Sequence, residues 1–145
     1  GPGILDEHSS RGLAIGDLDN DGEQEIVIVN MGEAPTLLKN TAPVSGRSVT
    51  VRLLTSTGRD AIGARATLSV GGQKQIDEVR SGGSFMSQSD LRLHFGVGKS
   101  STAELTVRWL SGKTESFPKI EAGQVVTIQE GKGIVHKQPY AVSKK

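Results

Sequence analysis

The sequence contains no cysteine, and aromatic residues make up only 3% of its 145 residues. Disulfides and thiolate metal sites are therefore excluded. A hydrophobic core must be built mainly from Val, Ile, Leu and Ala. No apolar run is long enough for a membrane-spanning helix, so we expect no membrane insertion. The net charge is only +1, with acidic and basic residues intermixed, and we expect no nucleic-acid partner.

Apolar and polar residues alternate over most of the chain. The alternating runs lie at residues 49–53, 64–70, 91–95 and 105–109, and a last apolar run lies at residues 125–128. Turn residues separate these runs, and the chain holds 19 glycines. A period of two with regular turns is typical of an antiparallel β-sandwich. The sequence therefore predicts an all-β fold, with Trp109 alternating as a core residue. The alternative for Trp109 is an exposed platform for a sugar.

The strongest chemical signal is an acidic stretch near the start of the chain. Residues 17–25 contain five carboxylates, and Asp17, Asp19 and Asp21 fall on alternate positions before Gly22. A tightly curled loop can aim such side chains at one hard cation, and Ca²⁺ requires six to eight oxygen ligands. Glycine allows the sharp turn because it adopts positive φ cheaply. The backbone carbonyl of Glu23 and the carboxylate of Glu25 complete the expected shell.

The flanks of this stretch predict strands and not helices. Residues 12–15 and 26–29 are short, apolar and rich in β-branched side chains. The twelfth position counted from Asp17 is Ile28, where an EF-hand requires Glu. We therefore expect a calcium loop on a β-hairpin. The alternative is an ordinary Asp- and Gly-rich hairpin turn.

Residues 80–90 form a second polar concentration. Arg80, Ser84, Gln88 and Asp90 could bind a polar ligand such as a glycan. The alternative is a long loop whose side chains cap its own backbone and neighbouring strands. No Lys-Ser/Thr pair or helix follows the glycines, so this is not a phosphate loop. No serine lies in a Gly-x-Ser-x-Gly elbow, and we expect no enzymatic activity.

Two parts of the chain resemble known families. Residues 10–22, SRGLAIGDLDNDG, resemble the FG-GAP/VCBS-type repeat, the calcium-loop motif of integrin-like β-propeller blades. The rest resembles the ASPIC/UnbV domain through IGAR at 62–65, EVRSGGSF at 78–85, SQSD at 87–90, LHFGVG at 93–98, VRW at 107–109 and SG at 111–112.

These resemblances imply a domain plan and a metal site. The plan is a repeat fragment at residues 1–43, an ASPIC/UnbV-like sandwich at 44–131 and a C-terminal tail at 132–145. The metal roles fall on Asp17, Asp19, Asp21 and Glu25, with Glu23 as the backbone ligand. The repeat usually ends in Asp where this chain has Glu25. A propeller needs several blades, so the resemblance implies further repeats upstream in a longer chain.

The resemblance also implies a function and a location. Such proteins are exported, to the periplasm, the cell surface or the extracellular space. We expect a non-enzymatic domain for adhesion or recognition, stabilised by structural Ca²⁺, with a protein or glycan as its partner. The alternatives are a carbohydrate-binding module and an accessory domain of an exported enzyme.

Overall fold

The N-terminal part of the chain forms a small sheet. The structure is a computed structural model that describes residues 5, 7–41 and 46–142. Strands β1 (Ser10–Gly16), β2 (Glu25–Asn30) and β3 (Thr36–Leu38) form a three-stranded sheet in the order β1-β2-β3. The predicted hairpin is therefore present, and the acidic stretch is the loop between β1 and β2.

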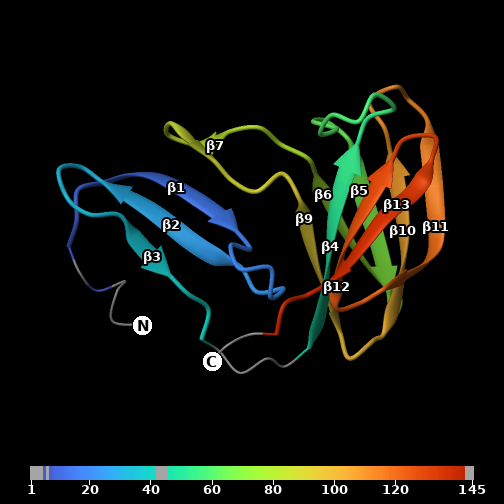
Figure 1. Ribbon diagram of the computed structural model, residues 1–145, viewed down its shortest axis with the longest axis horizontal. Coiled ribbons are helices and arrows are strands. Elements are labelled where there is room, and N and C mark those ends of the chain that lie inside the picture. Colours follow the sequence, from blue (N-terminus) through green and yellow to red (C-terminus); the bar gives the residue numbers. More distant parts are fainter. Residues whose placement is uncertain (1–4, 6, 42–45, 143–145) are drawn as a thin grey trace.

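Eight of the remaining strands form a β-sandwich of two four-stranded sheets (Figure 1). One sheet has the order β11-β10-β5-β6, made of β11 (Thr114–Glu121), β10 (Thr102–Arg108), β5 (Arg65–Val70) and β6 (Gln73–Glu78). The other has the order β13-β12-β4-β9, made of β13 (Gly133–Pro139), β12 (Gln124–Gln129), β4 (Arg47–Leu54) and β9 (Leu93–Gly98). The all-β fold is confirmed, and no helix among the described residues could cross a membrane.

The core lies between these two sheets and follows the predicted alternation. Its buried members include Val49, Val51, Leu53, Ala66, Leu68, Phe95, Leu105, Val107 and Ile128. Trp109 is buried as predicted, and its indole nitrogen donates a hydrogen bond to Glu115 at 2.9 Å. The Trp109 ring is therefore not exposed for stacking against a sugar.

The prediction of a C-terminal tail is wrong for most of that segment. We expected a tail from residue 132, but residues 133–139 form β13, an edge strand antiparallel to β12. The side chains of residues 135–139 are exposed, so this strand needs few apolar residues and gives little apolar signal in the sequence. The pairing of β12 with β4 is parallel, which the hairpin pattern did not predict. The expected boundary between residues 43 and 44 lies outside the described residues.

A short hairpin of the sandwich half covers the β1 edge of the three-stranded sheet. It consists of β7 (Gly83–Ser84) and β8 (Ser87–Gln88) and extends over β1 in Figure 1. The N–H groups of Leu13 and Ile15 donate to the hydroxyls of Ser84 and Ser89, at 3.1 and 3.2 Å. These bonds satisfy backbone groups that an open strand edge would expose.

Both faces of the three-stranded sheet carry exposed apolar side chains. Leu13 and Ile15 lie on one face and are 37% and 38% exposed. Val29 and Leu37 lie on the other face and are 53% and 57% exposed. Within the part of the chain that the structure describes, neither face is fully covered. A sheet that is apolar on both faces is typical of a layer that packs between two others.

Candidate functional site

The β1–β2 loop is wound by its own carboxylates. The N–H groups of Asp21 and Gly22 donate to the two carboxylate oxygens of Asp17, at 3.1 and 3.0 Å. The N–H of Glu23 donates to Asp21 at 2.8 Å. Gly22 has a φ of +85°, the positive value predicted for the residue after the third Asp. The spacing of the acidic residues therefore specifies the loop conformation directly.

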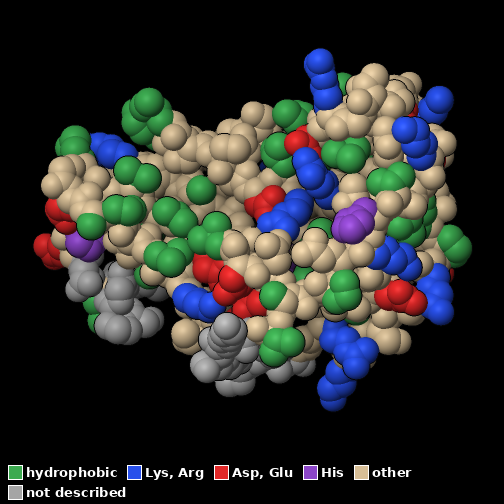
Figure 2. All heavy atoms as spheres, viewed as in Figure 1, with side chains coloured by type: hydrophobic (Ala, Val, Ile, Leu, Met, Phe, Trp, Pro, Cys, Tyr) green, Lys and Arg blue, Asp and Glu red, His purple; other side chains and the backbone are tan. Residues whose placement is uncertain are grey.

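The structure brings three of the predicted ligands together. Asp17, Asp19 and Asp21 each offer a carboxylate oxygen, and these oxygens lie within 4.8 Å of one another. Asp17 is buried, Asp21 is half-buried and Asp19 is exposed. Figure 2 shows acidic side chains gathered where the three-stranded sheet meets the sandwich.

Three buried carboxylate oxygens in this loop have no hydrogen-bond partner among the described residues. They are Oδ2 of Asp21, Oε2 of Glu23 and Oε1 of Glu25. The other oxygen of Glu25 accepts a hydrogen bond from the N–H of Leu18 at 3.0 Å. A buried carboxylate without a partner is costly, and a coordinated cation is one way to offset that cost. The donor set is oxygen only, which fits a hard divalent cation.

The structure adds the Glu23 side chain to the set of candidate ligands. We expected Glu23 to contribute only its backbone carbonyl, yet its carboxylate also has a buried, unpartnered oxygen. The signal was present in the sequence, because Glu23 is one of five closely spaced carboxylates.

Charges around the loop act on its titratable groups. Burial raises the pKa of the Asp17 carboxyl, although its N–H bonds and Arg92 oppose this shift. Lys39 lies 2.6 Å from Asp19, and its hydrogen bond lowers the pKa of that carboxyl. Sequence reasoning did not identify Lys39, which follows β3 and reaches the loop only through the fold.

Arg92 connects the loop to the sandwich. Its guanidinium donates to the backbone carbonyl of Asp17 at 2.8 Å and to Oδ1 of Asn20 at 2.5 Å. It also donates to the carboxylate of Asp90 at 2.7 Å. The hydrogen bond to Asp90 raises the pKa of Arg92, so the guanidinium stays charged.

Tyr140 and Ala141, which follow β13, lie across the same loop and form the C-terminal strap. The Tyr140 hydroxyl lies 2.9 Å from Oγ1 of Thr50, and the N–H of Ala141 donates to the carbonyl of Asn20 at 2.7 Å. Ser48 donates from its hydroxyl to the carbonyl of Gly22 at 3.0 Å. The loop is therefore held by groups from both ends of the sandwich sequence.

Replacement of Gly22 by Ala is expected to lower the free energy of unfolding by roughly 2 kcal/mol, because positive φ strains a residue with a Cβ. A Cβ at this position would also lie 2.4 Å from the Tyr140 ring. Thermal unfolding measures the loss. The matched control is Gly71→Ala, where φ is +56° and no atom lies within 4 Å of the added Cβ. Equal losses in the two variants would contradict a steric contribution from Tyr140.

The predicted ligand-binding loop is largely used for internal bonds. Ser84 accepts from Leu13, and Gln88 accepts from the N–H of Gly82 at 2.8 Å and donates to the carbonyl of Ser89 at 2.7 Å. Asp90 pairs with Arg92. Arg80 pairs with Asp77 at 2.9 Å, but its side chain is 73% exposed. The Arg80 side chain therefore remains accessible although it has an ion-pair partner.

Comparisons with known proteins concern mainly the sandwich. A family model described as ASPIC and UnbV matches residues 54–135. No curated protein matches the chain. Among solved structures, the chain is similar to a crystal structure from Bacteroides ovatus described as that of a candidate cell adhesion protein, with 10% identity and a TM-score of 0.36. The match covers 92% of this chain and 62% of that one.

Proposed function

The chain belongs to the ASPIC and UnbV family, and from that premise we propose that it is a non-enzymatic recognition domain stabilised by Ca²⁺ in the β1–β2 loop. The observation that carries the calcium proposal is the set of buried, unpartnered carboxylate oxygens on Asp21, Glu23 and Glu25. A hairpin turn alone needs no such oxygens.

The side chains that would hold the ion are those of Asp17, Asp19, Asp21 and Glu25, together with Glu23. When bound, the ion supplies positive charge to a loop that otherwise concentrates five carboxylates. Both oxygens of Asp17 already accept N–H bonds, but a carboxylate oxygen has lone pairs for further partners. The loop can therefore keep its winding and bind a cation.

The ion would act on more than the loop. Arg92, the C-terminal strap and Ser48 bind backbone carbonyls of residues 17, 20 and 22, respectively. Any ligand that binds only the folded loop stabilises those contacts too, because its binding free energy adds to that of folding. We therefore propose a structural role for calcium at the junction between the three-stranded sheet and the sandwich.

The three-stranded sheet supports a second part of the proposal. We infer that it is an FG-GAP/VCBS-type repeat that packs against further repeats in a longer, exported protein. The support is its two exposed apolar faces, which two flanking sheets would cover. Such a protein would serve adhesion or recognition at the cell exterior, with a protein or glycan partner.

Calcium at ten times its Kd is expected to stabilise the protein by about 1.4 kcal/mol, which corresponds to a rise of roughly 5 °C in Tm. Thermal melts in Ca²⁺ and in chelator measure this shift. Asp19→Ala should abolish it with little effect on the chelated protein, because Asp19 is exposed. The control Glu104→Ala removes an exposed carboxylate on β10 and should keep the shift. Identical melting curves for the unchanged protein in millimolar Ca²⁺ and in chelator would count against the site.

A further inference from the structure

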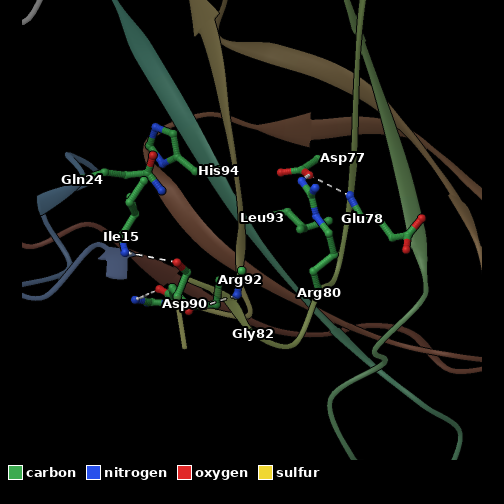
Figure 3. Close-up of a pocket in the computed structure, with 12 residues that line it drawn as sticks. Ile15, Gln24, Asp77, Glu78, Arg80, Gly82, Asp90, Arg92, Leu93 and His94 are labelled. Atoms are coloured by element: carbon green, nitrogen blue, oxygen red, sulfur yellow. Dashed lines mark hydrogen bonds and ion pairs between the residues drawn. The ribbon is translucent and has the colours of Figure 1, made fainter. Parts of the chain in front are cut away.

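A polar cleft lies where the three-stranded sheet meets the sandwich, beside the β1–β2 loop (Figure 3). Its volume is about 310 Å³, at the lower end of the range for small-ligand sites. Ile15 and Gln24 line it from the sheet side, and Asp77, Arg80 and His94 line it from the sandwich. The three-stranded sheet with its β1–β2 loop and the sandwich are the two units of the molecule, and both contribute to this one cavity.

Several polar groups in the cleft can still bond a ligand. The side-chain amide of Gln24 has no hydrogen-bond partner among the described residues, and it offers both a donor and an acceptor. One nitrogen of Arg80 binds Asp77, and its remaining N–H groups are accessible. His94 has Nδ1 at 3.5 Å from Oγ1 of Thr50, which leaves Nε2 available. Burial lowers the pKa of His94, so its ring is neutral at pH 7.

The charges of the cleft limit the kind of ligand. Its lining includes three carboxylates, on Asp77, Glu78 and Asp90, against the guanidiniums of Arg80 and Arg92. Each Arg pairs with a carboxylate of the same lining. Glu78 pairs with Arg65 outside the lining, so every carboxylate and guanidinium of the cleft already has a partner of opposite charge. The cleft therefore offers no unpaired charge to an ionic ligand, and its lining has no Phe, Tyr or Trp ring to hold an organic cation.

A neutral ligand with many hydroxyl groups fits these properties. Hydroxyls both donate and accept; around them the Asp77 carboxylate accepts, the Arg80 guanidinium donates and the Gln24 amide does both. In Figure 3, Gln24 and His94 lie toward one end of the cleft, Asp77 and Arg80 toward the other, and Leu93 lies between them. The aliphatic side chain of Ile15, which is partly exposed, can contact the C–H face of a sugar ring.

We propose that this cleft binds a neutral saccharide and that calcium in the adjoining loop strengthens the binding. The coupling, unlike the saccharide site itself, rests on the proposed calcium function. Gln24 lies between Glu23 and Glu25, two of the residues assigned to the ion. Arg92 binds Asp17 and Asn20 in the loop and Asp90 in the cleft. A cation that fixes the loop therefore fixes one wall of the cleft, and the coupling is reciprocal.

The test measures binding of the whole chain to immobilised mannan, xylan and β-glucan, with polygalacturonate as an anionic polymer, in Ca²⁺ and in chelator. We expect binding to at least one neutral polysaccharide, weakened at least tenfold by Gln24→Ala and by His94→Gln. Both variants should keep the calcium-dependent shift in Tm, which shows that they fold. The matched controls His136→Gln and Gln138→Ala alter exposed residues of β13 that do not line the cleft and should bind normally.

Three results would overturn parts of the inference separately. Binding to none of the neutral polysaccharides, or to polygalacturonate alone, would overturn the saccharide site. Full binding by both cleft variants would overturn its location. Binding that is equal in Ca²⁺, in chelator and in Asp19→Ala would overturn the coupling. The melting shift itself tests the calcium site, so failure of one proposal is distinguishable from failure of the other.

Discussion

Phe95→Ala is expected to lower the free energy of unfolding by about 3–5 kcal/mol, the usual cost of deleting a buried phenyl ring. Phe95 lies on β9 and is 2% exposed. It belongs to the cluster that fills the space between the two sheets. Because aromatics are scarce in this sequence, few other side chains could fill the cavity. Denaturant unfolding measures the loss, and Tm should fall by roughly 10–15 °C.

The chain offers a matched control at Phe85. This residue lies at the tip of the β7–β8 hairpin and is 63% exposed, so Phe85→Ala should change the free energy of unfolding by less than about 0.5 kcal/mol. Phe95→Leu should cost less than Phe95→Ala because much of the volume is retained. A loss below about 1 kcal/mol for Phe95→Ala would contradict the placement of Phe95 in the core.

Arg92→Ala is expected to cost about 3 kcal/mol and to separate the unfolding of the three-stranded sheet from that of the sandwich. The guanidinium makes charge-assisted bonds to Asp90, to Asn20 and to the carbonyl of Asp17. Its side chain is only 20% exposed. Removal leaves the Asp90 carboxylate without its cation and breaks two of the hydrogen bonds that join the three-stranded sheet to the sandwich. Calorimetry should show a lower first transition in which the three-stranded sheet unfolds.

The control for Arg92 is Arg65, which pairs with Glu78 at 3.4 Å on an exposed surface. Arg65→Ala should change the free energy of unfolding by at most about 1 kcal/mol, as for other surface ion pairs. Arg92→Lys should restore little, because an ammonium cannot reproduce the planar fork that reaches three partners. A single, unshifted transition for Arg92→Ala would contradict a major contribution of Arg92 to the contact between the three-stranded sheet and the sandwich.

The strands and the loop were predictable because their signals are local. Alternation at residues 49–53 and 105–109 depends only on the opposite orientation of successive side chains in a strand. The conformation of the β1–β2 loop follows from Asp17, Asp21 and Gly22, which are separated by at most five positions. The error at residues 133–139 has the same origin, since an exposed edge strand needs few apolar residues and gives a weak local signal.

The sequence by itself therefore determined the all-β class, the core residues and the acidic loop with its candidate ligands. The tertiary structure alone decided what surrounds that loop. Arg92 meets Asn20 across 72 positions, and Tyr140 meets Thr50 across 90. The cleft between Gln24 and His94 likewise depends on how the two units meet. Strand period and turn chemistry act over a few residues, whereas contacts between distant residues depend on how the strands are ordered and packed.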